Sequence, residues 1–216
     1  PSTISRWLSE HPFISNVFYP GLEGHRNHDV AKRQMRGFGG MLSFEPKGGT
    51  AAAPPGEALL PRVREHLAAA RARLHPLGAT VTADVFGLSP NEGGDVNIGQ
   101  QWETISSTSD HILPMMYPSH YLPVHLPGVP KPDLMPYETL FKSAGMARIR
   151  NDRMREAGFE PARVIVWLQA FQAPWLGDGV EYNAESVRQQ KKAVYDVGFD
   201  DWVLWHPGSQ YEPFLA

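Results

Sequence analysis

The chain contains no cysteine, which excludes disulfides, thiolate metal sites and cysteine nucleophiles. It also lacks an excess of either charge, because 20 Lys and Arg stand against 23 Asp and Glu, for a formal net charge of −3. Proteins that bind nucleic acids or membrane surfaces usually present a basic field, so neither kind of partner is expected. No apolar run approaches the roughly 18 residues that a membrane helix needs. These absences predict a globular protein but do not separate a cytoplasmic location from a cell-envelope or secreted one.

Motifs that hold cofactors or metals are also missing. The sequence has neither a phosphate-binding loop nor a nucleophile-elbow serine, and the glycines within 37–40 have the wrong spacing for a dinucleotide fingerprint. His111, His120 and His125 are close in sequence, but zinc ligands normally show tighter spacing and supporting carboxylates. The sequence therefore predicts no cofactor and no metal.

A stretch of small and helix-breaking residues divides the chain unequally. Residues 48–56 are Gly-Gly-Thr-Ala-Ala-Ala-Pro-Pro-Gly, which is typical of a linker or a junction. We therefore expect a fragment at 1–49, a junction at 50–56 and a domain at 57–216. The chain starts at Pro1 without an initiator Met or a signal-peptide pattern, so we expect it to be a fragment or a processed piece.

Helices and strands are expected to alternate downstream of the junction. Apolar residues at helical spacing predict an amphipathic helix at 57–75, and a β-branched run predicts a strand at 80–86. The same criteria place helices near 100–108, 137–157 and 184–197, and strands at 111–117, 163–171 and 201–206. Such alternation predicts parallel strands joined by crossovers. Four units make half of a (βα)₈ barrel, so the predicted fold class is α/β: parallel βα repeats forming half of a TIM-like barrel, with a small N-terminal α/β fragment.

Functional residues of parallel βα folds collect at the carboxyl ends of the strands. Four side chains stand at the predicted strand ends: Asp84, Tyr117, Gln169 and Trp205. The segment after Tyr117 adds an imidazole, His120, on a loop. Tryptophans in and near the strands offer flat rings on which the C–H-rich faces of sugars pack, although aromatic residues in strands and helices usually belong to the core.

Asp84 is the leading candidate for chemistry. It is followed by Val85-Phe86-Gly87 rather than by a helix, so a helix-capping role is not expected. Strand alternation places Asp84 opposite to Ala83 and Val85, which suit packing beneath helices. Two interpretations stay open: a catalytic or ligand-binding carboxylate, and a carboxylate that is hydrogen-bonded to loop amides.

Several separate motifs occur in the order and spacing of one known family. They are Thr82-Ala83-Asp84-Val85-Phe86-Gly87, Ile98-Gly99-Gln100-Gln101-Trp102-Glu103, Pro114-Met115-Met116-Tyr117-Pro118-Ser119-His120-Tyr121, Trp167-Leu168-Gln169 and Asp201-Trp202-Val203-Leu204-Trp205. The stretch from about 57 to 216 resembles the bacterial family of putative glycosyl hydrolase domains. The resemblance implies strands five to eight of a (βα)₈ barrel.

The same resemblance implies a carbohydrate-active domain that binds an oligo- or polysaccharide. Asp84 would be the acid/base or the oxocarbenium stabiliser. The binding residues would be Tyr117, His120, Trp167, Gln169 and Trp205. That family carries an acidic motif just upstream, Phe-Asp-Tyr-(Val/Ile)-Arg-Phe-Pro, which this chain lacks. Glycoside hydrolysis normally takes two carboxylates, so we expect weak or no activity unless a substitute serves. The candidate substitutes, each of which also suits a solvated surface, are Glu92, Asp95, Glu103 and Glu138.

Residues 4–49 resemble a different family. The motifs include Phe18-Tyr19-Pro20-Gly21-Leu22, Ala31-Lys32-Arg33-Gln34-Met35 and Gly39-Gly40-Met41-Leu42-Ser43-Phe44-Glu45. They resemble the start of the C-terminal domain of pyridoxal-phosphate enzymes of cysteine and methionine metabolism, of the cystathionine synthase and lyase type. The fragment contains neither the Schiff-base lysine motif nor the arginine that binds the substrate carboxylate, so it cannot run that chemistry alone.

Three functional hypotheses therefore remain. The first is a glycosidase-like domain, and the second is a non-catalytic carbohydrate-binding or structural half-barrel. The third is a remnant of a pyridoxal-phosphate lyase or transferase. A half-barrel also leaves backbone donors and acceptors unpaired on its edge strands, so we expect either a homodimer through these edges or a protein that associates non-specifically and unfolds with poor cooperativity.

Overall fold

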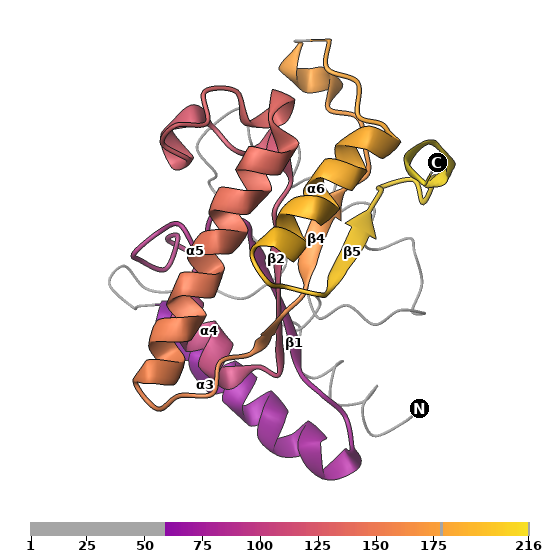
Figure 1. Cartoon of the computed structure of the whole chain (residues 1–216). Coiled ribbons are helices and arrows are strands. Elements are labelled where there is room, and N and C mark those ends of the chain that lie inside the picture. The colour runs from indigo at the N-terminus through magenta and orange to yellow at the C-terminus, as the bar shows by residue number, and fades with distance from the viewer. Residues whose placement is uncertain (1–58, 178, 216) are drawn as a thin grey trace.

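A computed structural model describes residues 59–177 and 179–215, and Figure 1 shows the path of the chain. The expected N-terminal fragment at 1–49 and the junction at 50–56 lie outside the described residues.

The described residues form helices and short strands in alternation, as expected. The helices are α3 (Leu59–Leu74), α4 (Trp102–Thr108), α5 (Pro136–Glu156) and α6 (Ala184–Asp196). The strands are β1 (Thr82–Phe86), β2 (His111–Met115), β3 (Arg163–Val164), β4 (Val166–Gln169) and β5 (Trp202–Trp205). None of the helices in the described part of the chain has the length and apolarity to cross a membrane.

The third expected strand is interrupted, and the cause lies in the neighbouring strand. Residues 163–171 form β3 and β4 with a break at Ile165 instead of one strand. The Ile165 N–H donates to the carbonyl of Ile112 at 3.1 Å. The next residue of β2 that should donate an N–H back to this strand is Pro114. Because proline has no N–H, one bond of the ladder cannot form there.

All strand pairings in the sheet are parallel. The order is β1-β2-β4-β5, and β3 also pairs with β2. The register places Asp84 opposite Leu113, and Trp167 opposite Val203. The predicted class of parallel βα repeats is thus confirmed. β1 and β5 end the order, and no described strand pairs with their outer edges, so the barrel is not closed within this part of the chain.

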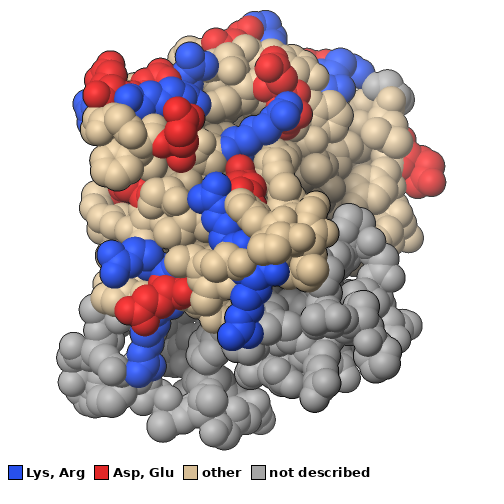
Figure 2. Space-filling view, turned by 90° about the horizontal axis from the view of Figure 1, so that it is seen from below, with Lys and Arg blue, Asp and Glu red and all other residues tan. Residues whose placement is uncertain are grey.

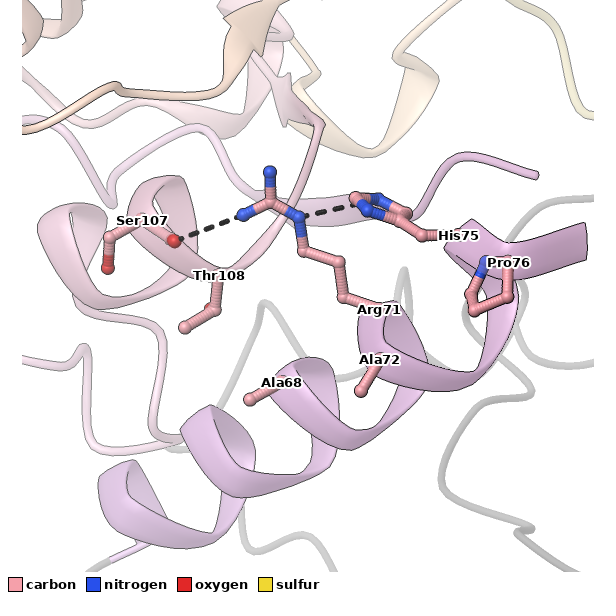
Figure 3. A pocket seen from close by; sticks show the side chains of 7 residues that line it. All are labelled: Ala68, Arg71, Ala72, His75, Pro76, Ser107 and Thr108. Carbon is pink, nitrogen blue, oxygen red and sulfur yellow. Dashed lines mark hydrogen bonds between the residues drawn. The ribbon is translucent and has the colours of Figure 1, made fainter. Parts of the chain in front are cut away.

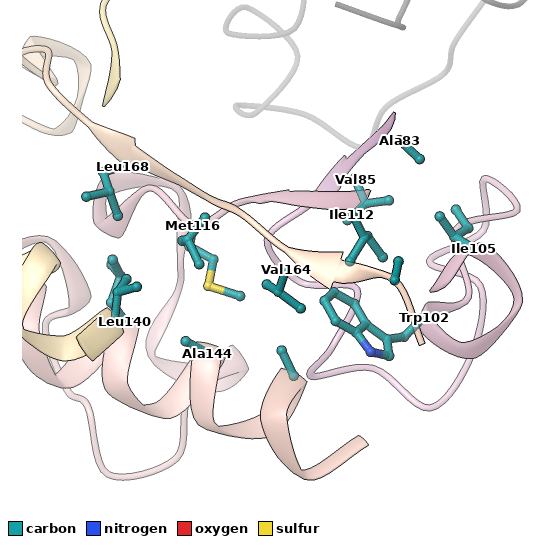
Figure 4. Packing of buried hydrophobic residues seen from close by; sticks show 14 of the residues in the cluster. Ala83, Val85, Trp102, Ile105, Ile112, Met116, Leu140, Ala144, Val164 and Leu168 are labelled. Carbon is teal, nitrogen blue, oxygen red and sulfur yellow. The ribbon is translucent and has the colours of Figure 1, made fainter. Parts of the chain in front are cut away.

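Helices cover one face of this sheet. In Figure 1, α5 and α6 lie side by side in front of the strands, with α3 and α4 below them. Alternate strand residues point into this layer, as Figure 4 shows for Val85, Ile112 and Leu168 against Trp102 and Leu140. These five side chains are all below 1 % exposed. Fully burying a large apolar side chain contributes roughly 1.5–3 kcal/mol, so this layer is the main source of stability.

The other face of the sheet carries a second, separate cluster. It consists of the buried Leu113, Tyr117, Trp167 and Phe171, with Met115, Ile165, Val203 and Trp205 packed against it. Asp84 is on this face, since Ala83 and Val85 on either side of it belong to the helix-covered core. The expected separation of the two faces of β1 is therefore confirmed.

A close backbone contact at Gly87 holds the loop that follows β1. A Cβ at this position would lie 2.4 Å from the carbonyl oxygen of Met115 and 2.5 Å from the hydroxyl of Tyr121. The Tyr121 hydroxyl donates to the carbonyl of Gly87 at 2.8 Å. Only glycine fits here. The contact ties the loop after β1 to the loop after β2, and both loops border the carboxyl ends of the strands.

Candidate functional site

A carboxyl group and several aromatic rings lie on the face of the sheet opposite to the helices, with Asp84 in the middle of β1 and Tyr117 and Trp205 at the carboxyl ends of β2 and β5. Asp84 comes from β1, Tyr117 from just beyond β2, Trp167 from β4 and Trp205 from the end of β5. Tyr117, Trp167 and Trp205 belong to the same cluster on the face of the sheet opposite to the helices. The structure therefore brings these four sequence-predicted residues to one face.

Asp84 is held by an indole. The Nε1–H of Trp167 donates to Oδ1 of Asp84 at 2.8 Å, a contact between residues 83 positions apart. Burial raises the pKa of Asp84 to about 6, and the Trp167 hydrogen bond opposes this rise only in part. The carboxyl is thus poised to hold or release a proton close to neutral pH, as a general acid requires.

Trp205, at the end of β5, packs against the indole that holds this carboxyl. Its ring meets the Trp167 ring edge-on, with the centroids 5.8 Å apart and an angle of 86° between the planes. Edge-to-face pairs are favourable because the positive edge of one ring faces the negative face of the other. The Trp167 indole is thereby held in place while its N–H serves Asp84.

Tyr117 and His120 form an uncharged polar and aromatic group on the loop after β2. The Tyr117 ring contacts His120 and Phe171 edge-on, with both centroid distances at 5.3 Å. Burial raises the pKa of Tyr117 well above its usual value, and the negative charge of Asp84 raises it further. Burial lowers the pKa of His120 to about 4. Both side chains are therefore neutral near pH 7 and can act as hydrogen-bonding or stacking groups.

Gln169 has a different position from the one expected. We predicted a substrate-binding side chain, but the structure buries it completely. Its Oε1 accepts hydrogen bonds from the amide of Ser119 at 3.1 Å and from the hydroxyl of Ser119 at 2.9 Å. Its Nε2 donates to the carbonyl of Phe171 at 3.0 Å. The amide therefore ties together the loops that follow β2 and β4, and it positions the neighbours of Tyr117 and His120.

Two buried polar side chains that position the site were not identified from the sequence, Ser119 and Gln190. Ser119 donates to Gln169 and lies 3.1 Å from Nδ1 of His120, so it orients the imidazole. Gln190 on α6 accepts from the amide of Gln169 at 2.8 Å and donates to its carbonyl at 2.9 Å. A signal for Gln190 was available, because it occupies a core-facing position of α6 between Val187 and Val194.

The candidate second carboxylates lie elsewhere. Glu103 on α4 pairs with Arg150 of α5, and Asp95 accepts the amides of Asn97 and Gly99 within its own loop. Glu138 stands in the first turn of α5, where a carboxylate suits the helix dipole. The hydrogen bond that Asp84 accepts comes from Trp167, and none of the hydrogen bonds among the described residues links it to these carboxylates.

The three histidines of the sequence do not form one group. His111 opens β2 and lies 3.5 Å from the Thr82 hydroxyl, whereas His120 follows the other end of that strand. Nδ1 of His125 accepts from the amide of Leu122 at 3.0 Å. Within the described ranges, no cluster of three or more His, Cys, Asp or Glu side chains could hold a metal ion.

A hollow of about 440 Å³ lies at the opposite, amino end of the strands, between α3 and α4. Figure 3 shows Arg71 directed at His75 and at the carbonyl of Ser107. Both side chains contact the carboxylate of Asp110, which also accepts the Val81 amide at 2.6 Å. Burial would raise the pKa of Asp110, but these three partners hold it below its usual value.

This amino end is therefore a structural region. Figure 2, seen from below, shows Lys and Arg interleaved with Asp and Glu on this side. An ion-paired surface of mixed charge is the ordinary exterior of a folded domain. The polar side chains Arg71 and His75 of the hollow serve these structural contacts.

Comparisons with known proteins divide the chain as the sequence motifs do. Residues 50–211 match the family described as "Putative glycosyl hydrolase domain", and residues 2–60 match the family described as "Cys/Met metabolism PLP-dependent enzyme". Both resemblances drawn from the motifs are confirmed.

The curated relatives match a short stretch. An L-methionine gamma-lyase of Fusobacterium nucleatum subsp. polymorphum is 54 % identical over 46 residues, 21 % of this chain and 12 % of that protein. A cystathionine gamma-synthase of Mycobacterium leprae is 53 % identical over 51 residues, 24 % of this chain and 13 % of that protein. The chain thus spans about an eighth of the length of these relatives.

One solved structure is similar in outline, the glycoside hydrolase domain of PgaB (BpsB) from Bordetella bronchiseptica. It is 14 % identical, with a TM-score of 0.40, and the match covers 68 % of this chain and 40 % of that one.

Protonation of Asp84 is expected to control stability. Because its folded pKa of about 6 exceeds the unfolded value near 4, the folded state binds the proton more tightly. The stabilisation that comes from protonation of Asp84 is fully present below about pH 4 and is lost as the pH rises through 6. Asp84→Asn cannot ionise, so it should unfold with a free energy up to about 3 kcal/mol higher than the parent at pH 8. At pH 4 the gain should fall below about 1 kcal/mol.

Urea unfolding at pH 4 and pH 8 measures this difference. Asp200→Asn is the control, because Asp200 is exposed and its substitution should change stability by less than about 0.5 kcal/mol at either pH. An Asp84→Asn variant that is no more stable than the parent at pH 8 would contradict the buried, proton-holding carboxyl.

Gln190→Leu is expected to destabilise the chain by about 2 kcal/mol or more, because it leaves the amide and the carbonyl of Gln169 buried without partners. Gln189→Leu is the control on the same helix, since Gln189 is half-buried and donates only to Glu185. Denaturant unfolding compares the two. Equal, small losses would show that the Gln190 pair does not fix the end of β4.

Proposed function

This chain belongs to the family of putative glycosyl hydrolase domains, and we propose that it binds a glycan at the carboxyl ends of its strands, with Asp84 as the proton donor. The observation that carries the proposal is the partly buried carboxyl of Asp84, with its pKa near 6 and its hydrogen bond from Trp167. A carboxyl with this pKa remains partly protonated near neutral pH and can protonate the oxygen of a leaving sugar.

The rings around Asp84 support a sugar ligand. Trp167 donates a hydrogen bond to the carboxyl, Trp205 packs edge-on against Trp167, and Tyr117 lies in the same cluster. Aromatic faces pack against the C–H groups of a pyranose, and a neutral phenol or imidazole can bind hydroxyl groups. In this proposal Trp167 both orients Asp84 and lines the site.

Turnover by the chain alone is proposed to be weak or absent. Glycoside hydrolysis requires a base or nucleophile as well as the acid, and the two carboxyl groups are usually about 5–10 Å apart. Among the described residues, the candidate carboxylates Glu103 and Asp95 are used in other contacts, and Glu138 stands in the first turn of α5. The same observation favours the second candidate function, a half-barrel that binds carbohydrate without cleaving it.

The division at 50–56 remains a proposal, with 1–49 as a fragment of a pyridoxal-phosphate enzyme and 57–216 as the glycosyl-hydrolase-like part. A remnant of lyase or transferase function would belong to that first part. The homodimer also remains a prediction: β1 and β5 end the described sheet, and a second copy would extend it through these edges. The mass of the chain in solution tests it.

Asp84→Asn separates catalysis from binding. We expect it to abolish any release of reducing sugar by the parent while changing the Kd for the same oligosaccharide less than about threefold, because Asn keeps the acceptor for Trp167. Reducing-end assays and calorimetric titration, with Asp200→Asn as the control, measure the two effects. If the parent binds but releases no sugar, the non-catalytic function holds; if Asp84→Asn retains full turnover, Asp84 is not the acid.

A further inference from the structure

Trp175 is a large aromatic side chain left open to solvent on the same side of the sheet as Asp84. It lies on the 3₁₀ turn Pro174–Leu176 in the loop that follows β4, and 48 % of its surface is exposed. This loop leaves the carboxyl end of β4, which carries Trp167. About half of this indole is therefore available to a ligand.

The exposed ring is supported from behind by two other rings. Phe171 stacks on Trp175, with centroids 6.2 Å apart and planes 28° apart. His120 meets Trp175 edge-on at 6.0 Å. Phe171 is itself only 2 % exposed and packs on Tyr117. The indole is therefore held in one orientation before any ligand arrives, which lowers the entropic cost of binding.

The loop that carries Trp175 is also fixed at its base. Nε2 of Gln172 donates to the carbonyl of Tyr182 at 2.6 Å, and the amide of Tyr182 donates to Oε1 of Gln172 at 2.8 Å. The hydroxyl of Tyr182 donates to the carbonyl of Asp133 at 2.9 Å. A hollow of about 520 Å³ lies along this loop, between Gln172 and Glu181. Trp175 is not among the residues that line this hollow, and the hydrogen bonds of Gln172 and Tyr182 hold the loop that presents the ring.

The loops at this end carry few cationic side chains. The loops after β1, β4 and β5 contain neither Lys nor Arg, and the loop after β2, residues 116–135, contains one, the exposed Lys131. Arg150 and Lys142 reach them from α5, but they bind the backbone carbonyls of Glu92 and Pro127. Burial keeps His120 neutral, since its pKa is about 4. A glycan with several carboxylate or sulfate groups would thus find only Lys131 as a cation on these loops, which favours an uncharged ligand.

We propose that Trp175 is a stacking platform for a sugar ring of an uncharged glycan, forming an outlying subsite of the strand-end site. The inference rests on the proposed function and adds a residue and a ligand class to it. Trp175 stacks on Phe171, which belongs to the same buried cluster as Tyr117 and Trp167, so the exposed ring is anchored to the cluster that holds the partner of Asp84. A sugar stacked on Trp175 belongs to the same chain as the sugar beside Asp84, and its binding adds affinity without chemistry.

Calorimetric titration with xylo-, cello- and malto-oligosaccharides, and with polygalacturonate as the anionic probe, tests this subsite. Trp175→Ala should raise the Kd for the bound neutral oligosaccharide about tenfold or more, as truncation of a central tryptophan does at interfaces. Trp175→Phe keeps a flat ring and should raise it less than about threefold. Leu176→Ala is the matched control, since Leu176 is 40 % exposed on the same turn, and it should leave the Kd unchanged.

The outcomes separate this inference from the proposed function. If the parent binds a neutral oligosaccharide and Trp175→Ala binds it equally well, the subsite is wrong and the proposed function stands. If the parent binds none of the probes, both are wrong. Tighter binding of polygalacturonate than of every neutral probe would overturn the uncharged class. Tryptophan emission of the parent should shift on binding, and a full shift in Trp175→Phe would also contradict the subsite.

Discussion

The hydrogen bond from the Trp167 indole to the Asp84 carboxylate is the contact on which the site depends. β1 and β4 do not pair with each other; both pair with β2, so about two strand spacings, roughly 9.6 Å, separate them. An indole is long enough to reach across the middle strand. Without the indole N–H, the Asp84 carboxyl would lose its hydrogen-bond partner among the described residues. Burial of a carboxyl group on an apolar face without such a partner is energetically unfavourable. The hydrogen bond therefore offsets part of the cost of burying Asp84, whose pKa is raised by that burial.

Buried amides give the loops around this pair their shape. The side chain of Gln169 ties Ser119 to the carbonyl of Phe171, and Gln190 satisfies the backbone of Gln169 from the helix side. Such groups are stable in a core only when every polar atom has a partner, so their geometry is specified closely. Tyr117, His120 and Phe171 then need little rearrangement to receive a ligand.

The sequence predicted the alternation of helices and strands, the parallel class and the faces of Asp84 and Trp167, because these depend on local periodicity. It could not predict the break at Ile165, which arises from Pro114 in another strand, nor the Trp167–Asp84 bond between residues 83 positions apart. Gln169 was expected to bind substrate because it stands at a strand end. That position does not reveal that its side-chain oxygen accepts hydrogen bonds from Ser119. Ring contacts across loops, such as Phe171 on Trp175, likewise depend on tertiary structure.

Thermal unfolding of the chain tests the central claim, a preformed glycan site at the strand ends, most directly. A ligand that binds only the folded state stabilises it by mass action, by about 2.7 kcal/mol at 100 times its Kd. Scans are run with neutral oligosaccharides and with pyridoxal phosphate. The account predicts a cooperative transition whose midpoint rises with at least one oligosaccharide and does not change with pyridoxal phosphate. A midpoint that no oligosaccharide moves, or that only pyridoxal phosphate raises, would contradict it.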